Sequence, residues 1–249
     1  MKAIILAAGQ GTRLRPLTDE VPKCMVSVNG ISILEHALKT LNKVGIVDIS
    51  VVCGYKEEKI TSSNFKKYIN ARFEETNMVY SFFCAQEEFN DDIILCYGDI
   101  IFDSKIPEAL LKSTDDFAVI VDKEWQKQWA LRMEDPLTDA ESMKVDKQNN
   151  IIELGKKAKY IDEIEGQYIG MVKISKKILP KIIDFYNTLD KNALYNGQTF
   201  EKMYVTDFIQ LIIDKLMPAK AVWVSGGWFE VDSCNDLKII NEQFDQIIK

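Results

Sequence analysis

The sequence has little histidine and no closely paired cysteines. Its 249 residues include one histidine, His36, and five cysteines, none of them in a C-x-x-C pair. A single histidine excludes a zinc site built from histidines and argues against a Ser–His catalytic pair. The odd number of cysteines, three of them in or beside apolar strand-like runs, indicates reduced, buried thiols rather than a disulfide framework.

Long apolar runs and an excess of positive charge are also missing. No stretch of about 18 apolar residues occurs, which excludes a membrane-spanning helix. The apolar run Ala3–Ala8 is too short for a signal peptide and is typical of a buried strand in a cytoplasmic protein. The formal net charge is −7, whereas a general nucleic-acid binder carries a basic face. We therefore expect a cytoplasmic protein with neither nucleic acid nor a membrane as its partner.

The charge that is present is unevenly distributed. Residues 1–23 contain four basic and two acidic side chains, so this segment carries +2 while the rest of the chain carries −9. The basic segment also contains two glycines, Gly9 and Gly11. This combination favours a small anionic ligand that binds locally at the N-terminal segment.

Strand-like and helix-like segments alternate along the first half of the chain. Expected strands are 2–7, 49–53, 71–74, 92–97 and 117–121; expected helices are 32–44, 80–89 and 106–111, with a polar helix-like stretch at 56–68. This alternation predicts βαβ units and an α/β fold with a mostly parallel sheet. Ligands of such sheets bind at the carboxyl ends of the strands.

The second half has shorter strand candidates. They are 129–134, 143–146, 151–154 and 168–174, followed by a hairpin of 221–225 and 228–231 across Gly226–Gly227, with helices at 176–187, 206–216 and 233–248. We expect one domain, 1–249, in three parts. Residues 1–122 form a nucleotide-binding core, 123–225 an acceptor-binding region, and 226–249 carry a second metal-binding aspartate and the closing helix.

A glycine loop follows the first strand. It reads Ala7-Ala8-Gly9-Gln10-Gly11-Thr12-Arg13-Leu14, and its glycines allow backbone N–H groups to approach phosphates closely. A dinucleotide-binding fingerprint requires a third glycine where Leu14 stands, and a P-loop requires a G-K-[ST] sequence that is absent. The remaining interpretation is a nucleotidyl-transfer loop.

Arg13 and Lys23 are the cations that nucleotidyl transfer needs. A phosphate anion attacks the α-phosphorus of a nucleoside triphosphate, so positive groups must offset the repulsion and the charge on the departing pyrophosphate. Arg13 suits multi-donor capture of the β- and γ-phosphates, and Lys23 suits a point contact at the reacting phosphates. We predict both as catalytic residues.

The segment L-A-A-G-Q-G-T-R-L-R-P-L-T…P-K resembles the signature of nucleotidyltransferases that make nucleotide-activated sugars and alcohols. The resemblance implies a Rossmann-like, mostly parallel sheet flanked by helices, with a smaller mixed β region for the acceptor. It also implies nucleotide-binding residues, namely Leu6, Ala7, Ala8, Gly9, Gly11, Thr12, Arg13 and Gly98. The segment Asn77–Ser81 resembles the phosphocholine cytidylyltransferase branch, which adds Asn77, Tyr80 and Ser81 near a pyrimidine and implies CTP as the nucleotide.

Two aspartates resemble the metal pair of this family. Asp99 follows the strand 92–97, and Asp232 lies in the motif E-x-D-S before the last helix. Mg²⁺ is usually held by one or two carboxylates together with phosphate oxygens and water, so we predict a Mg²⁺ site at these two residues. The residues alone also allow Asp99 to be a turn residue and Asp232 to be the N-cap of the last helix.

Stretches of the second half resemble cytidylyltransferases that act on phosphoglutamine in capsule biosynthesis. The predicted acceptor-binding residues are Trp129, Arg132, Glu153, Lys156, Glu165 and Tyr168. Aromatic and acidic side chains can enclose an ammonium group, and a basic one can meet a carboxylate. The predicted partners are thus CTP and a small phosphorylated amino compound, for which glutamine phosphate is the best candidate.

Other functions remain open from the sequence. Within the family these are a phosphocholine, 2-aminoethylphosphonate or sugar-1-phosphate nucleotidyltransferase, and outside enzymes a nucleotide-sensing regulatory subunit. The joint presence of Lys23, Asp99 and Asp232 argues against a catalytically silent subunit. Whether the chain forms a homodimer is also left open.

Overall fold

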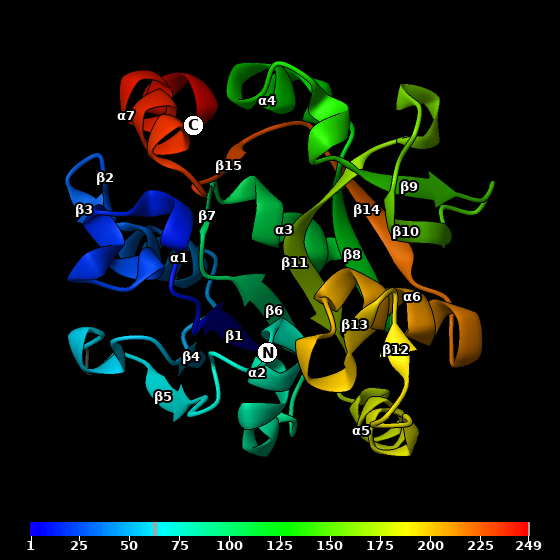
Figure 1. Cartoon of the computed structure of the whole chain (residues 1–249). Coiled ribbons are helices and arrows are strands. Elements are labelled where there is room, and N and C mark those ends of the chain that lie inside the picture. Colours follow the sequence, from blue (N-terminus) through cyan, green and yellow to red (C-terminus); the bar gives the residue numbers. More distant parts are fainter. Residues whose placement is uncertain (62–63, 249) are drawn as a thin grey trace.

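The computed structural model describes residues 1–61 and 64–248, and its centre is a seven-stranded sheet (Figure 1). The strand order is β14-β8-β11-β6-β1-β4-β5. The bounds are β1 (Lys2–Ala7), β4 (Ile49–Cys53), β5 (Lys66–Ile69), β6 (Ile93–Tyr97), β8 (Phe117–Asp122), β11 (Gln167–Ile174) and β14 (Lys220–Val224). Only β11 runs against its neighbours, so the expected α/β class with a mostly parallel sheet is confirmed.

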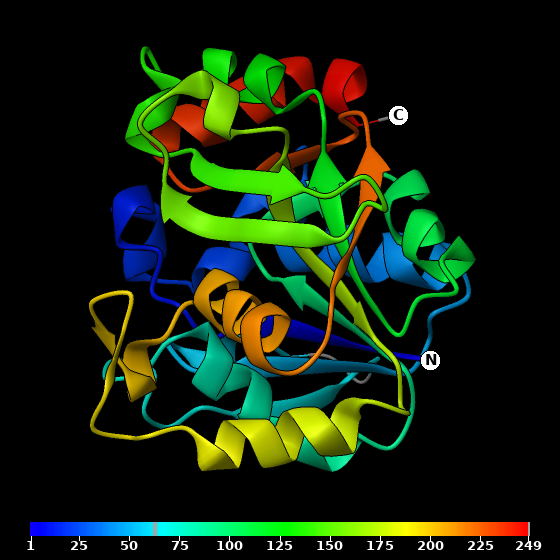
Figure 2. The ribbon, with the colours of Figure 1, turned by 90° about the vertical axis from the view of Figure 1, so that its right-hand side faces the viewer.

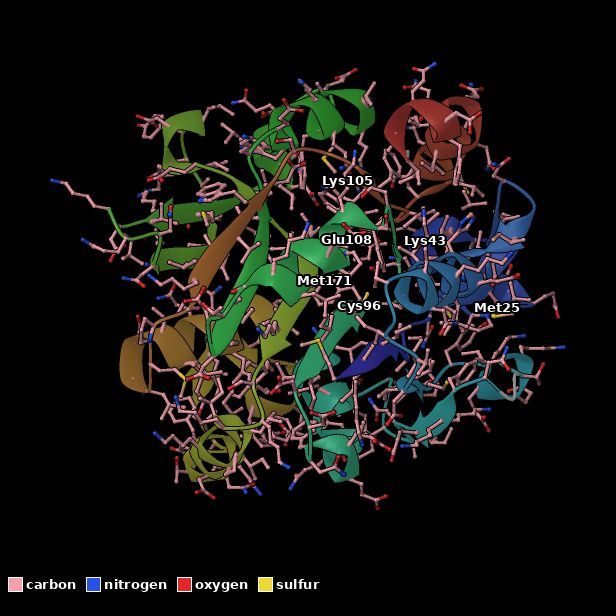
Figure 3. The ribbon with its side chains drawn as sticks, turned by 180° about the vertical axis from the view of Figure 1, so that it is seen from behind. Met25, Lys43, Cys96, Lys105, Glu108 and Met171 are labelled. Carbon is pink, nitrogen blue, oxygen red and sulfur yellow. The ribbon has the colours of Figure 1, made fainter. Side chains whose placement is uncertain are left out.

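Helices cover both faces of this sheet. They are α1 (Ile33–Lys43), α2 (Met78–Cys84), α3 (Lys105–Lys112), α4 (Trp125–Arg132), α5 (Leu179–Thr188), α6 (Val205–Lys215) and α7 (Cys234–Ile247). Successive strand residues point to opposite faces. In β1, Ile5 therefore packs with α1 and α3, while Ile4 packs with α2, α5 and α6. Figure 3 views the α1–α3 side, where Cys96 of β6 and Met171 of β11 are paired neighbours.

Short strand pairs complete the fold. They are β9 (Glu141–Val145) with β10 (Ile151–Lys157), β7 (Ile100–Phe102) with β15 (Trp228–Glu230), β2 (Ser27–Val28) with β3 (Ile31–Ser32), and β12 (Leu194–Tyr195) with β13 (Gln198–Thr199). Figures 1 and 2 show α4 and α7 at the top of both views, with β9 and β10 below them in the upper half. Along 1–61 and 64–248, no helix is both long and apolar enough to cross a bilayer.

Two predictions in the first half are wrong. The stretch 56–68 is not a helix: a short 3₁₀ turn covers Glu57–Lys59 and the edge strand β5 begins at Lys66, while residues 62–63 lie outside the described ranges. The predicted strand at 71–74 is a turn. The cause is the exposed edge, because β5 is polar and its side chains are mostly accessible, so it lacks the apolar alternation of a buried strand.

Two predictions in the second half are also wrong. Residues 129–132 of the expected strand 129–134 belong to helix α4, in which Trp125 and Trp129 lie on one buried face with their rings 5.8 Å apart. The segments on either side of Gly226–Gly227 do not form a hairpin, because β14 pairs with β8 in the main sheet and β15 pairs with β7. The two glycines carry the chain from one sheet to the other.

Candidate active site

The glycine loop after β1 is held against Lys23. Gly11 adopts a left-handed conformation with φ 66°, and a Cβ at this position would lie 2.7 Å from the Cβ of Lys23. The hydroxyl of Thr18 donates to the Gly11 carbonyl oxygen at 2.8 Å. Because side chains are strained in this conformation, glycine allows the loop to pass directly over Lys23.

Gly98 joins the carboxyl ends of β1 and β6. Its N–H donates to the carbonyl oxygen of Leu6 at 2.9 Å, and a Cβ on Gly98 would lie 2.5 Å from the same oxygen. Any other residue would push these strand ends apart. The predicted nucleotide-binding residues 6–9, 11–13 and 98 therefore lie along one strand end and its loop, with Asp99 beside them.

The four residues predicted for catalysis and metal binding meet here. The Lys23 ammonium donates to Asp99 Oδ2 at 2.7 Å and to Asp232 Oδ1, and Arg13 Nη2 donates to Asp232 Oδ2 at 2.9 Å. Lys23 is 14% exposed and Arg13 is 64% exposed, so Arg13 remains accessible to a ligand. Burial alone would lower the pKa of Lys23, but the surrounding carboxylates raise it above its ordinary value.

Glu230 is a site residue that the sequence prediction missed. One carboxylate oxygen from each of Asp99, Glu230 and Asp232, here called the carboxylate trio, lies within 4.8 Å of the others. Burial and the charges of its two partners raise the pKa of Glu230 to about 8. The sequence did contain a signal for Glu230, because Glu230 is the first residue of the E-x-D-S motif. Side chains alternate between the two sides of an extended chain, so Glu230 points to the same side as Asp232.

The trio fits a divalent cation. Asp99 Oδ1 is buried and has no hydrogen-bond partner among the described residues. An unpaired buried carboxylate oxygen is costly, and carboxylate oxygens are the ligands that hard divalent cations prefer. Burial would raise the pKa of Asp232, yet Lys23 and two arginines hold it below its ordinary value, so this carboxylate is ionised for such a role.

Arg132 fixes the trio from within the protein. Its side chain is 1% exposed; Nη1 donates to Glu230 Oε2 at 3.0 Å and Nε donates to Asp236 Oδ1 at 2.9 Å. Nη2 lies 3.8 Å from Asp232 Oδ2. Arg132 was predicted to bind the acceptor, and these contacts instead pair it with carboxylates of the chain itself.

Asp232 is not the N-cap of α7, because Ser233 accepts the capping hydrogen bond from Asp236 N.

A cavity of about 290 Å³ adjoins the trio, and we call it the site cavity. Its lining includes two groups of residues, which we call its two ends. Arg13, Glu230 and Asp232 form one, linked by the Arg13–Asp232 ion pair and by the ion pairs of Arg132 with Glu230 and Asp232. Asp139, Glu141 and Gln167 form the other, in which Gln167 bonds to the Glu141 backbone. The predicted residues Asn77, Trp129 and Tyr168 also line it. Sequence positions separated by more than 200 residues therefore face one cavity, which is partly open to solvent.

Other predicted site residues lie apart from the site cavity. Glu153 and Lys156 pair with each other at 3.1 Å on β10, and Glu165 is exposed; none of the three lines the cavity. Tyr80 stacks on Arg72 with 5.5 Å from ring centre to guanidinium, and buried Ser81 accepts a hydrogen bond from Asn70. Their roles stay predictions.

The fold and the site together define a nucleotidyltransferase: a glycine loop, two cations and a carboxylate trio meet at the carboxyl ends of a mostly parallel sheet. The family described as "MobA-like NTP transferase domain" matches residues 3–178, and the chain belongs to this family. The signature segment and the fold that it implied are thereby confirmed.

Relatives with known activities are similar over different lengths. The chain is 42% identical over 251 residues to the CTP:phosphoglutamine cytidylyltransferase of Campylobacter jejuni, covering 96% of this chain and 98% of the relative. It is 35% identical over 118 residues to the choline-phosphate cytidylyltransferase of Streptococcus pneumoniae, covering 46% of this chain and 52% of that protein.

Solved structures share the fold. The inositol-1-phosphate CTP transferase of T. maritima aligns with a TM-score of 0.75 at 24% identity, over 99% of this chain and 95% of that one. The CTP:phosphocholine cytidylyltransferase LicC of Streptococcus pneumoniae aligns with a TM-score of 0.71 at 22% identity, over 98% of both chains.

Proposed function

We propose that this chain is a Mg²⁺-dependent cytidylyltransferase. It condenses CTP with a small phosphorylated amino compound, and the best candidate for this acceptor is glutamine phosphate. The reaction releases pyrophosphate and gives a CDP-linked product for capsule or surface-polysaccharide modification. The observation that carries the reaction type is the meeting of Lys23, Arg13 and the carboxylate trio beside the site cavity, which Arg13, Glu230 and Asp232 line. The full-length similarity to the Campylobacter jejuni enzyme supports the choice of substrates.

The chain's own groups account for the transfer step. An oxygen of the acceptor phosphate attacks the α-phosphorus of CTP, and the bond between that phosphorus and the β-phosphate oxygen breaks. No general base is required, because a phosphate monoester is already ionised near neutral pH. Backbone N–H groups of the glycine loop and the Arg13 guanidinium hold the triphosphate, and Lys23 offsets the charge that builds on the leaving pyrophosphate.

Mg²⁺, when bound, would supply positive charge that offsets the charge of the phosphates. Asp99, Glu230 and Asp232 would hold it, and Arg132 would keep Glu230 and Asp232 in place. We further propose that the enzyme works in the cytoplasm, where CTP is made. Residues 1–122 would form the nucleotide-binding core and residues 123–225 the acceptor-binding region, while residues 226–249 supply the second metal-binding aspartate and the last helix.

Pyrophosphate release across a matrix of substrates tests the reaction. The matrix crosses CTP, UTP, dTTP and GTP with phosphoglutamine, phosphocholine, 2-aminoethylphosphonate and glucose 1-phosphate, all with Mg²⁺. We expect CTP with phosphoglutamine to give the highest kcat/KM and a CDP-linked product by mass spectrometry. Absence of turnover of CTP with every phosphorylated amino compound would overturn the proposal.

An Asp232→Asn variant tests the metal site. We expect its half-saturating Mg²⁺ concentration to rise about tenfold or more, and its affinity for Mn²⁺, followed by electron paramagnetic resonance, to fall in parallel. Asp214→Asn is the matched control, because Asp214 is exposed on α6 and bonds only to Gln210 among its described contacts. An unchanged Mn²⁺ affinity in Asp232→Asn would remove this carboxylate from the site.

A further inference from the structure

The far end of the site cavity contains acidic side chains without a cation. Asp139 precedes β9, Glu141 is its first residue, and Asp207 lies in the first turn of α6 behind the cavity wall. Within 1–61 and 64–248, no lysine, arginine or histidine forms an ion pair with any of the three. Asp207 is buried, Glu141 is half-buried and Asp139 is exposed. A carboxylate that is removed from water without a cation is costly, so Asp207 and Glu141 call for a functional reason.

Each of these acidic groups also makes its neighbours harder to ionise. Burial, followed by the charges of Asp207 and Asp139, raises the pKa of Glu141 to about 7. Burial raises the pKa of Asp207 as well, and its Oδ2 is buried without a hydrogen-bond partner among the described residues. A cation delivered to this end of the cavity would therefore be bound strongly, since it would relieve both burial and repulsion.

The two acids that face the cavity are held in fixed positions. The side-chain amide of Gln167 accepts from Glu141 N at 3.1 Å and donates to Glu141 O, so both backbone groups of Glu141 are engaged. Asp139 Oδ2 accepts from the Trp129 indole N–H at 3.1 Å. The Glu141 backbone and the Asp139 carboxylate are therefore held in place, and preorganised groups lose little entropy when a ligand binds.

Aromatic side chains also line the cavity. The rings of Tyr97 and Tyr168 lie edge to face with centres 5.6 Å apart, and Trp129 and Trp228 line the same cavity. The face of an aromatic ring attracts an ammonium group. One cavity thus holds unpaired carboxylates, aromatic rings and the Arg13–Asp232 end that we propose to bind phosphates.

We propose that Glu141 and Asp139 bind the protonated amine of the acceptor while its phosphate lies at the Arg13–Asp232 end. The inference rests on the proposed function, and it narrows the acceptor class to phosphorylated compounds with a primary ammonium group. Such a group donates three hydrogen bonds and can therefore reach both carboxylates, whereas a quaternary ammonium group donates none. Sugar phosphates lack the charge altogether.

Two probes that differ only in the amine test this inference. Phosphoethanolamine and ethyl phosphate share a phosphate and a two-carbon chain, but only the first has an ammonium group. By calorimetry with the wild-type protein, we expect phosphoethanolamine to bind at least about tenfold more tightly than ethyl phosphate. In Glu141→Gln this preference should fall to about twofold or less, with ethyl phosphate binding unchanged. Phosphocholine should bind less tightly than phosphoethanolamine to the wild type.

Controls keep the result specific. Glu108→Gln removes a surface carboxylate of α3 (labelled in Figure 3) that pairs with Lys112 and does not line the site cavity, and this variant should retain the full preference. Asp139→Asn keeps an oxygen for the Trp129 indole, so it tests the second carboxylate without loss of that hydrogen bond. If Glu141→Gln did not fold, Asp139→Asn would decide, with a reduced preference expected.

The outcomes separate this inference from the proposed function. If Glu141→Gln and Asp139→Asn bind phosphoethanolamine as the wild type does, the amine site is overturned, even when CTP and phosphoglutamine are turned over. If no phosphorylated amine is turned over with CTP but the amine preference depends on Glu141, the proposed reaction is overturned and the amine site stands. A KM for phosphoglutamine that rises in Glu141→Gln, with the KM for CTP unchanged, supports both.

Discussion

The two ends of the site cavity are both rich in carboxylates, yet they differ in how the charge is compensated. At one end, Asp99, Glu230 and Asp232 contact Lys23, Arg13 and Arg132. At the other, Asp139 and Glu141 have no ion pair within the described ranges. The first end has cations of the chain beside its carboxylates and therefore fits anionic phosphates. The second end has no such cation, and a positively charged group of the substrate can take that place.

This difference predicts opposite consequences when a charge is removed. At the paired end, loss of one partner leaves a buried charge uncompensated, which destabilises the protein or the transition state. At the unpaired end, loss of the Glu141 carboxylate relieves burial and repulsion, which stabilises the protein and weakens substrate binding. Substitutions at the two ends therefore test the comparison directly.

The largest effect is expected from Arg132→Gln. Arg132 is buried between Glu230, Asp232 and Asp236, and its removal leaves these carboxylates without their buried partner. We expect the free energy of unfolding in urea to fall by about 3–5 kcal/mol. A double-mutant cycle with Asp236→Asn should recover part of this loss, because the second change removes one of the stranded charges. A loss below about 1 kcal/mol would show that the network contributes little.

The next effect is expected from Lys23→Ala. Loss of the ammonium removes a cation from the reacting phosphates, so kcat/KM should fall about 100- to 1000-fold while the fold is retained. Lys173→Ala is the matched control: Lys173 is also a buried lysine, but it lies in β11 and donates to the Ser113 carbonyl oxygen. The control should lose stability and keep its activity. Near-normal turnover by Lys23→Ala would exclude Lys23 from the mechanism.

The same comparison explains which parts could be predicted from the sequence. Arg13 and Lys23 lie in a contiguous segment whose chemistry and family resemblance can be recognised locally, and the apolar runs of β1, β4, β6 and β8 identify the sheet. The edge strand β5 was missed because its exposed residues lack a buried face. Helix α4 was mistaken for a strand because its aromatic residues have strand propensity, although Trp125 and Trp129 have helical spacing.

The unpaired end could not be predicted, because its residues share no motif. Glu141 and Asp207 are brought together by the packing of α6 against β10, the partner strand of β9. Glu153 and Lys156 were chosen instead from composition, yet they pair with each other on the outer side of β10. Burial and the absence of a cation are tertiary properties, so the acidic end becomes visible only when the chain is folded.

The smallest effect, and the one that most sharpens the comparison, is the pH dependence of stability in Glu141→Gln. The groups that face Glu141 are Asp139, Asp207, Tyr97 and Tyr168, all neutral or negative. The pKa of Glu141 is about 7 in the folded chain, whereas an unperturbed glutamate carboxyl has a pKa of 4.5. Between these values the folded chain retains a proton that the unfolded chain releases, so this group lowers stability as pH rises through that interval.

Glutamine cannot ionise and removes this contribution. We expect Glu141→Gln to unfold at the same free energy as the wild type near pH 4 and to be more stable by about 2–3 kcal/mol at pH 8, measured by urea unfolding across the pH range. Glu108→Gln should show no such pH-dependent gain. A Glu141→Gln variant that is destabilised at pH 8 would mean that a cation of the chain already compensates Glu141. The two ends of the cavity would then not differ in the way described above.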